Sequence, residues 1–493
     1  GGFGNKLHLV QHEICAVALS KRSGRPVKAV LTRREQLEAT KTSFNYEMDA
    51  KMGVTDDGTI VAWEEEVLQD EGAYTEYGLG VVGGAAGNTS MLLYDVPNLR
   101  LQGSVVYTNC TPGSAVRGTG VRQLAFAREC LISEAADDLG IDPIEMRSRQ
   151  VITNEDCPYE TRVGNIVTSI GTSEVIETAV EAIDYRRRRE EAATDPNVGI
   201  GVAIGTNISG CRPRGLDSDI GTVDVRFEAD GSVTLWTEAT DMGTSCRTTI
   251  SQIAADVLGI EPESVRVVDG DTEKTPPGSG SHSSRTISII GSGAARAADA
   301  VGDSLKRIAA RELEASEADV VLEGREARIQ GTDRGVALDT LADIAYNRAG
   351  RLPEGMDAGD LSQSMTFDTR TPDLAAPTDL IDEDATGNIS NDYPPGCAIA
   401  VVSVDPDTGR VHVESVVDVQ DVGRAINPTV VEGQIHGGVV QGIGSALFEE
   451  LEYDPETGEL LNADFREYAV PLAADVPDID ARFVEVPSKT TPG

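Results

Sequence analysis

One arrangement recurs three times in this 493-residue chain and restricts its fold: two strands joined by a tight turn, followed by an Asp-x-Gly triplet. The copies span residues 46–72, 221–243 and 397–423, and the first reads YEMDAKMGVTDDGTIVAWEEEVLQDEG. In each copy, Val and Ile alternate with polar residues around a DG or DTG turn, which is a strong hairpin signal. No fixed period of about 20–50 residues links the copies, so they do not indicate a solenoid.

Helical patterns alternate with these hairpins. Apolar residues recur at helical spacing in residues 125–141, 246–260, 293–315 and 430–451. Hairpins that alternate with helices predict an α+β fold of layered sheets and helices.

The length of the chain predicts at least two domains, because 493 residues exceed one ordinary hydrophobic core. The stretch near 185–195, YRRRREEAATD, is dense in charge and has no apolar face, so we interpret it as a linker. We therefore predict one domain over residues 1–190 and a second over residues 191–493.

The net charge of −40 excludes nucleic acid as a general partner, because phosphate binding requires dense Lys and Arg. Acidic residues are spread through periodic segments, and the basic residues include only eight lysines. An acidic, arginine-rich surface of this kind favours a protein of a high-salt cytoplasm, where screening weakens self-repulsion.

The seven cysteines are scattered without a C-x-x-C pair, which argues against a disulfide framework and against an iron–sulfur cluster held by this chain. No run of about 18 apolar residues is present, so no membrane span is predicted.

Glycine-rich loops precede several of the predicted helices. Glycine lets backbone N–H groups approach an anion closely, and a helix N-terminus adds a favourable dipole. Such loops suit a large phosphorylated cofactor, although tight turns in a glycine-rich protein are the alternative. The loops contain Gly1–Gly4, Arg117–Gly120, Met242-Gly243, Gly278–Ser281 and Gly437–Gly442.

Other catalytic motifs gain no support. Residues 78–83 fit G-x-G-x-x-G but lack a clean preceding strand and a later acidic residue. His8 and His12 are spaced i, i+4 without an H-E-x-x-H motif, so a surface or packing role is favoured over a metal site. Neither a P-loop nor G-x-S-x-G is present, and the side chains alone offer no catalytic constellation.

Taken together, the glycine loops resemble the molybdopterin-binding large subunit of the xanthine dehydrogenase/aldehyde oxidase family, the molybdenum hydroxylases, which includes carbon monoxide dehydrogenase large subunits. GGFGNK resembles the family's GGGFGGK loop, and the segment DVGRAINPTVVEGQIHGGVVQGIGSALFEEL is the most similar stretch. Four further stretches are similar in the same order: GRPVKAVLTRREQL, TNCTPGSAVRGTGVRQLAFARE, DMGTSCRTTISQIAADVLGI and GSGSHSSRTISIIGSGA.

The resemblance implies that both domains are molybdopterin-binding and that the protein hydroxylates an aldehyde or an N-heteroaromatic substrate with oxygen from water. Its cofactor would be molybdenum–molybdopterin in the cytosine dinucleotide form, with no metal ligand from this chain. Arg117 and Gly118 would form the loop beside the metal. The cofactor contacts implied by the resemblance are Gly2, Phe3, Gly4, Gly243, Ser283, Ser284, Arg285 and Gln441.

The resemblance also implies partners: a small 2Fe–2S subunit and a medium FAD subunit that accept electrons, assembled as a dimer of heterotrimers. A catalytic glutamate is expected in a G-x-K-G-x-G-E loop beyond Gly493, so the sequence is interpreted as an internal piece of a larger subunit. A non-catalytic cofactor-binding or assembly subunit of the same family is the alternative.

Three departures from the family pattern bear on substrate and cofactor. Thr244-Ser245 stands where the family often has Gln, which removes one expected hydrogen bond to the pterin. Gly118 stands where copper-containing carbon monoxide dehydrogenases use a cysteine, so carbon monoxide oxidation by that route is not expected. Ser43 lies at roughly the position of a purine enzyme's arginine, which weakens a xanthine assignment.

Overall fold

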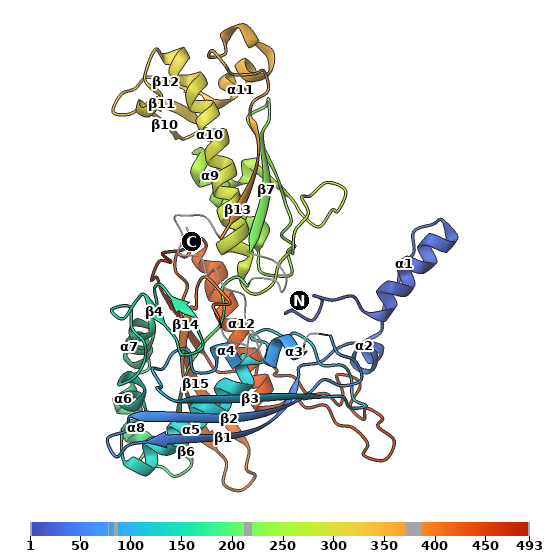
Figure 1. The fold of residues 1–493 in the computed structure, drawn as a ribbon, viewed down its shortest axis with the longest axis vertical. Coiled ribbons are helices and arrows are strands. Elements are labelled where there is room, and N and C mark those ends of the chain that lie inside the picture. The colour runs from blue at the N-terminus through green and yellow to red at the C-terminus, as the bar shows by residue number, and fades with distance from the viewer. Residues whose placement is uncertain (1, 77, 83–86, 212–218, 370–386, 492–493) are drawn as a thin grey trace. The chain divides into compact units, whose positions relative to one another are not determined.

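The computed structural model describes residues 2–76, 78–82, 87–211, 219–369 and 387–491, and these fall into two compact units (Figure 1). The first unit groups Gly1–Ile208, Asp379–Gly423 and Val431–Val486. The second unit groups Ser209–Thr378, Arg424–Val430 and Pro487–Gly493. Both units are assembled from separate stretches of the chain, whereas the predicted boundary near residue 190 is a single division of the sequence and stays a prediction.

The first unit contains two larger sheets that share one helix. One sheet has the strand order β1-β2-β3, and the other has the order β16-β15-β14-β6. Helix α5 contacts β1 of one sheet and β6 of the other, while α7 covers β14 and β15. The helices of this unit are α1 Gln11–Ser23, α2 Arg33–Ala39, α3 Gly78–Gly80, α4 Gly87–Thr89, α5 Val121–Leu139, α6 Pro143–Ser148, α7 Thr172–Ala182, α8 Tyr185–Ala192 and α12 Pro428–Leu447, whose first three residues are grouped with the second unit.

The strands of the first unit pair in both senses. β1 runs antiparallel to β2, which is parallel to β3, and β16 is parallel to β15 in an otherwise antiparallel sheet. These strands are β1 Asn45–Val54, β2 Ile60–Asp70, β3 Leu99–Val106, β4 Tyr159–Glu160, β5 Ile166–Val167, β6 Val198–Thr206, β14 Pro395–Val404, β15 Val411–Asp421 and β16 Ile479–Val484.

The second unit packs helices α9 and α10 with a sheet of order β13-β7-β8-β9 (Figure 1). Small residues of α10 such as Ala294, Ala297 and Ala298 are fully buried at helical spacing, which lets the helix approach β7 and β13 closely. A three-stranded sheet, β10-β11-β12, also packs with α10 and α11. The elements are β7 Ile220–Phe227, β8 Val233–Thr237, α9 Cys246–Leu258, β9 Val265–Val268, the π-helix η3 Thr286–Gly291, α10 Ser292–Leu313, β10 Val320–Glu323, β11 Glu326–Ile329, β12 Gly335–Ala337, α11 Leu338–Asn347 and β13 Ser362–Asp368.

The structure confirms the α+β class, the three hairpins and the four helices. The hairpins are β1-β2, β7-β8 and β14-β15, and the helices are α5, α9, α10 and α12. Periodicity identified them because each buries one face of regular spacing.

The predicted linker near residues 185–195 is wrong, because most of it forms α8. Arg187 pairs with Asp184 at 2.6 Å and with Glu191 at 2.6 Å, and Tyr185 is buried. Ion pairs at i, i+3 and i, i+4 stabilise a helix that has no broad apolar face.

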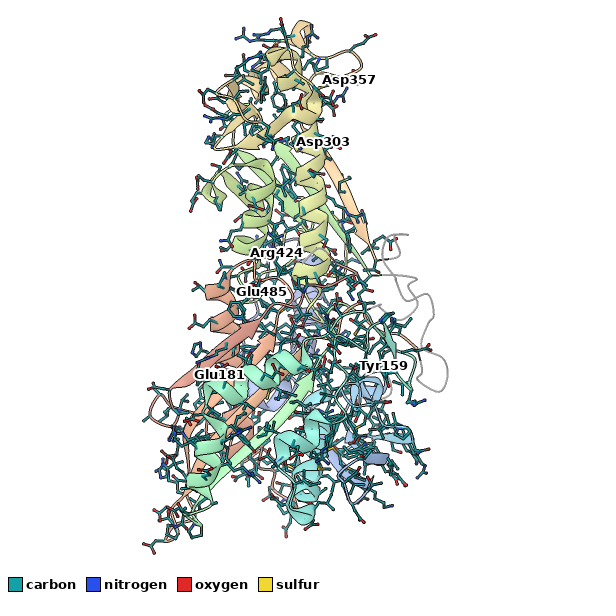
Figure 2. The ribbon with its side chains drawn as sticks, turned by 90° about the vertical axis from the view of Figure 1, so that its left-hand side faces the viewer. Tyr159, Glu181, Asp303, Asp357, Arg424 and Glu485 are labelled. Atoms are coloured by element: carbon teal, nitrogen blue, oxygen red, sulfur yellow. The ribbon has the colours of Figure 1, made fainter. Side chains whose placement is uncertain are left out.

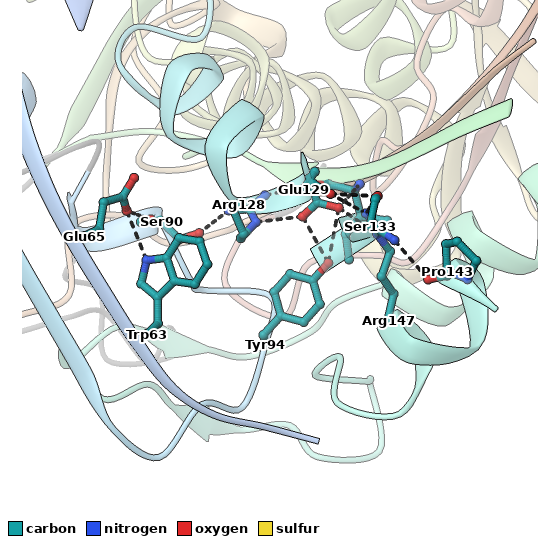
Figure 3. A network of polar contacts seen from close by, with 10 residues as sticks. Trp63, Glu65, Ser90, Tyr94, Arg128, Glu129, Ser133, Pro143 and Arg147 are labelled. Carbon is teal, nitrogen blue, oxygen red and sulfur yellow. Dashed lines mark hydrogen bonds and ion pairs between the residues drawn. The ribbon is translucent and has the colours of Figure 1, made fainter. Parts of the chain in front are cut away.

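A buried polar network joins α5 to the rest of the first unit (Figure 3). Glu129 is only 4% exposed, and its carboxylate accepts from Arg128 Nε at 2.7 Å and from Arg147 Nε at 2.8 Å. Tyr94 Oη and the Ile204 N–H donate to the same carboxylate, at 3.1 Å each. The two guanidinium groups hold the pKa of the Glu129 carboxyl below its usual value against the opposing effect of burial.

The G-x-G-x-x-G pattern of residues 78–83 falls partly on α3, and Gly83 lies outside the described residues. Glu71 Oε1 accepts from the Gly78 N–H at 3.1 Å, so this glycine packs against a protein carboxylate. Of the helices that the structure describes, none is both long and apolar enough to cross a membrane.

We predict that Glu129→Ala destabilises the first unit by about 3–5 kcal/mol, because it leaves two buried guanidinium groups without their counter-charge. Denaturant unfolding followed by circular dichroism measures this loss. Glu134→Ala, an exposed position on the same helix, is the control and should change stability by less than about 0.5 kcal/mol. Equal effects of the two substitutions would contradict the assigned role of the network.

Candidate functional site

The N-terminal glycine loop lies against the segment that precedes Arg117. Phe3 has a φ of 51° and Gly4 a φ of 101°, so the backbone turns sharply here. A Cβ on Gly4 would lie 3.1 Å from the carbonyl oxygen of Ala115. The structure therefore brings the N-terminal glycine loop against Ala115, two residues before the expected Arg117–Gly120 loop.

Arg117 lies on α12. Its Nη2 donates to the carbonyl oxygen of Gln434 at 3.0 Å, and its guanidinium carbon lies 3.4 Å from where a Cβ on Gly438 would be. Loss of water lowers the pKa of Arg117, partly countered by the nearby carboxylate of Asp418. Burial in turn raises the pKa of Asp418. Within the described part of the chain, Arg117 is thus a cation near the carboxylate of Asp418, and its hydrogen bond to Gln434 uses only part of its donor capacity.

Residues 437–442, predicted as a glycine-rich loop, instead lie within α12. Gln441 lies on the same face of this helix as the residues that Arg117 contacts. Positions 434, 438 and 441 follow the i, i+4, i+7 spacing, which places them on one helical stripe. The Oε1 atom of Gln441 is buried and has no hydrogen-bond partner among the residues that the structure describes. Burying an amide oxygen without a donor costs free energy, so this atom is suited to a ligand that supplies one.

Gly118 lies in the turn that leads into α5. Its φ is 72°, and a Cβ there would lie 2.8 Å from Cγ of Arg122. Gly120, with a φ of 74°, is the N-cap residue of α5. Both its backbone conformation and its contact with Arg122 favour glycine at residue 118.

In the second unit, Gly243 belongs to the loop that enters α9. Its φ is 108°, and its N–H donates to Asp241 Oδ1 at 2.9 Å. Ser245, the N-cap residue of α9, has a φ of 56° and makes no capping hydrogen bond with its side chain. The first turn of α9 thus keeps backbone N–H groups available for an anion.

The serine loop, defined here as residues 278–285, lies beside that turn. Ser281 Oγ accepts from the Thr240 N–H at 3.0 Å, which joins the two segments. Ser283 and Ser284 have φ values of 46° and 55°, a left-handed conformation that costs a non-glycine residue about 1 kcal/mol or more. Two such residues in succession, separated from a π-helix by Arg285 alone, mark the loop as a functional candidate.

Arg285 is fully buried, and each of its three guanidinium nitrogens donates to a protein acceptor. Nε donates to Asp219 Oδ1 at 2.8 Å, Nη1 to the Gly280 oxygen at 2.6 Å, and Nη2 to the Ile220 oxygen and to Glu238 Oε1. The side chain therefore faces the protein, whereas Ser284 is exposed.

Three carboxylates near these residues escaped the sequence analysis: Asp219, Glu238 and Asp418. Glu238 follows directly after β8, a strand that is almost entirely buried. It is itself buried although it is ionisable. A buried charge at the end of such a strand is the signal that could have identified it.

The candidate residues thus form two sets, one in each unit. Gly2, Phe3, Gly4, Arg117, Gly118 and Gln441 belong to the first unit, and Gly243, Ser283, Ser284 and Arg285 belong to the second. Both sets combine strained or glycine-rich turns with hydrogen-bonding groups, and these features suit a large, anionic, hydrogen-bonding ligand.

Two families match the sequence. Residues 178–477 match a family described as molybdopterin cofactor-binding domain, and residues 1–151 match a second family of the same description.

Curated relatives extend this likeness. The chain is 34% identical to the nicotine 6-hydroxylase large subunit of Paenarthrobacter nicotinovorans, with 100% of this chain and 59% of the relative covered. It is 30% identical to the carbon monoxide dehydrogenase large chain of Hydrogenophaga pseudoflava, with 100% and 60% covered. The chain thus spans about three fifths of the length of these relatives.

A solved structure is similar throughout. Quinoline 2-oxidoreductase from Pseudomonas putida 86 aligns with a TM-score of 0.89 and 32% identity, over 100% of this chain and 62% of that one.

We predict that His282 makes the second unit sensitive to acid. Burial, and secondarily Arg285, lower the pKa of His282 from 6.5 to about 4. The unfolded state therefore binds more protons between these values, so stability falls as the pH drops through this range. His282→Gln should reduce this loss by about 1–2 kcal/mol, allowing for solvent screening of a partly exposed ring. Denaturant titrations at several pH values across this range measure the free energy of unfolding. If its pH dependence in His282→Gln equals that of the wild type, the prediction is contradicted.

Proposed function

Because this chain belongs to the molybdopterin cofactor-binding family of molybdenum hydroxylase large subunits, we propose that it binds molybdenum–molybdopterin within the catalytic subunit of an oxidoreductase. The observation that carries the proposal is Gln441, which lies on the helical stripe that Arg117 also contacts. Its buried Oε1 has no donor among the described residues.

In the first unit, the residues proposed to hold the cofactor are backbone and amide groups. Gly2, Phe3 and Gly4 offer N–H groups from a sharply turned loop, and Gln441 offers an amide. Pterin rings carry several hydrogen-bond donors, and the unpaired Oε1 can accept from one of them. Arg117 places a cation on the same face, where its charge attracts an oxyanion.

In the second unit, the proposed contacts suit phosphate groups. The loop at Gly243 and the first turn of α9 provide backbone N–H groups and the positive end of a helix dipole. The serine loop adds the hydroxyls and N–H groups of Ser283 and Ser284. Arg285 acts here by fixing the loop, since its guanidinium is engaged by the protein.

The bound molybdenum cofactor supplies the oxidising centre that accepts two electrons when a substrate C–H bond is hydroxylated with oxygen from water. The chain's own residues bind and orient the cofactor, and Arg117 stabilises negative charge beside it. The general base, a glutamate, is proposed to lie in a further part of the subunit.

The proposed substrates are N-heteroaromatic compounds or aldehydes. The relatives named for nicotine hydroxylation and quinoline oxidoreduction support the first class. Gly118 lacks the thiolate that a copper ion would require, so carbon monoxide is not proposed as a substrate.

We further propose the cytosine dinucleotide form of the cofactor and electron transfer to partner proteins that carry 2Fe–2S clusters and FAD, in a dimer of heterotrimers. Names such as "large subunit" and "large chain" among the relatives support assembly with other subunits.

A high-salt cytoplasm is the proposed location. The net charge of −40 is its main support, and exposed acids such as Glu181, Asp303 and Asp357 illustrate how this charge is displayed (Figure 2). Mutual repulsion of such charges is relieved when counter-ions are concentrated.

The purified full-length complex should contain about one molybdenum and one pterin per large subunit. Gln441→Leu removes the unpaired amide and should lower this content severalfold, measured by metal analysis and by the nucleotide released on acid treatment. Val439→Ala, which trims a buried side chain on the same helix, is the matched control and should retain the cofactor.

A wild-type complex without molybdenum or pterin would overturn the proposal. A complex that holds the cofactor, but is not reduced by any aldehyde or N-heteroaromatic compound tested, would favour the non-catalytic alternative.

Salt should stabilise the protein. Raising KCl from about 0.2 M to about 2 M should raise the unfolding temperature, because screening relieves the repulsion among the acidic groups. Scanning calorimetry in KCl measures the shift. A lower or an unchanged unfolding temperature with increasing KCl would contradict a high-salt adaptation.

A further inference from the structure

A buried ionic cluster lies beneath the serine loop, and the sequence analysis did not anticipate it. Arg285 is fully buried, while the side chains of Asp219 and Glu238 are 4% and 2% exposed. Arg285 Nε lies 2.8 Å from Asp219 Oδ1, and Arg285 Nη2 lies 3.4 Å from Glu238 Oε1. Two carboxylates therefore share one guanidinium in a site shielded from water.

Glu238 also holds the serine loop directly. The Gly280 N–H donates to Glu238 Oε2 at 3.4 Å, and the carbonyl oxygen of the same glycine accepts from Arg285 Nη1 at 2.6 Å. A Cβ on Gly278 would lie 1.2 Å from Glu238 Oε2, so the carboxylate fills the space beside that glycine. The cluster thus binds both the backbone N–H and the backbone carbonyl of Gly280.

Gly280 lies three residues before the strained part of the loop, Ser283 and Ser284. Ser283 and Ser284 keep left-handed φ values that non-glycine residues adopt only when their surroundings impose them. The surroundings are specific: the Ser283 oxygen accepts from the Gly210 N–H at 2.8 Å, and the Arg285 N–H donates to the His282 oxygen at 2.9 Å. Arg285 follows these serines in sequence and anchors the far end of the loop.

The charges of the cluster are directed inward. Burial raises the pKa of Asp219 and that of Glu238, with Arg285 opposing this in both cases. Because the guanidinium is neutralised within the protein, Arg285 adds little positive charge at the loop surface. What the loop offers a ligand is the precise placement of its N–H and hydroxyl groups.

We propose that Glu238 is a positioning residue, which acts through Arg285 and the Gly280 peptide to hold the serine loop in the conformation that binds the molybdopterin cofactor. This inference rests on the proposed function. Glu238 itself faces the buried cluster and need not touch the cofactor.

The test compares cofactor release from purified holoenzymes. Glu238→Gln keeps the shape of the side chain, but its amide nitrogen cannot accept from the Gly280 N–H or from Arg285. The variant should lose molybdenum and the pterin at least severalfold faster than the wild type, at a temperature well below unfolding. Asp219→Asn, which loosens the other side of Arg285, should act in the same direction.

Leu341→Ala is the matched control, because it opens a cavity at a fully buried position on α11 of the same unit. It should lower the unfolding midpoint and leave the release rate unchanged. If Glu238→Gln releases the cofactor at the wild-type rate, the proposal is overturned. It is also overturned if Leu341→Ala releases the cofactor as fast as Glu238→Gln does, since the effect would then be general destabilisation.

Hydrogen exchange of the cofactor-free proteins separates this inference from the proposed function. The amides of residues 280–284 should exchange faster in Glu238→Gln than in the wild type, and unchanged exchange would contradict the positioning role. If the wild type binds no molybdopterin, the proposed function fails whatever the exchange shows. If Glu238→Gln does not fold, Asp219→Asn decides by the same measurements.

Discussion

Buried ion clusters that pair carboxylates with guanidinium groups lie beside the candidate cofactor-binding loops of this protein. In the first unit, Glu129 lies between Arg128 and Arg147 on the helix that begins directly after the Arg117–Gly120 loop. In the second unit, Arg285 lies between Asp219 and Glu238 beneath the serine loop. Ions buried in this way persist only if each is paired, so the clusters impose one arrangement on the backbone around them.

This rigidity suits the proposed binding of a cofactor. That role would require placement more than reactivity: the proposed contacts are turned backbone at Gly4 and Gly243, an amide at Gln441, and a cation at Arg117. The strained backbone at Ser283 and Ser284 persists because many contacts of the surrounding structure impose this conformation. The large acidic charge is kept mainly on the surface, where solvent and salt can screen it.

Local periodicity was enough to predict the hairpins and the long helices, because each buries a regularly spaced face. The Arg-rich stretch at α8 was misread because ion pairs at helical spacing replace an apolar face there. The candidate residues were predicted from their resemblance to the family's motifs. The structure adds the contacts of these residues, which motifs do not describe. That Arg285 faces Asp219 and Glu238, and that Gln441 has an unpaired oxygen, depend on contacts between residues distant in sequence.

Anomalous diffraction at the molybdenum edge from crystals of the full-length complex tests the account most directly. The account predicts a molybdenum peak with pterin density in contact with the Gln441 amide. A peak remote from Gln441, or crystals of active enzyme without molybdenum, would contradict it.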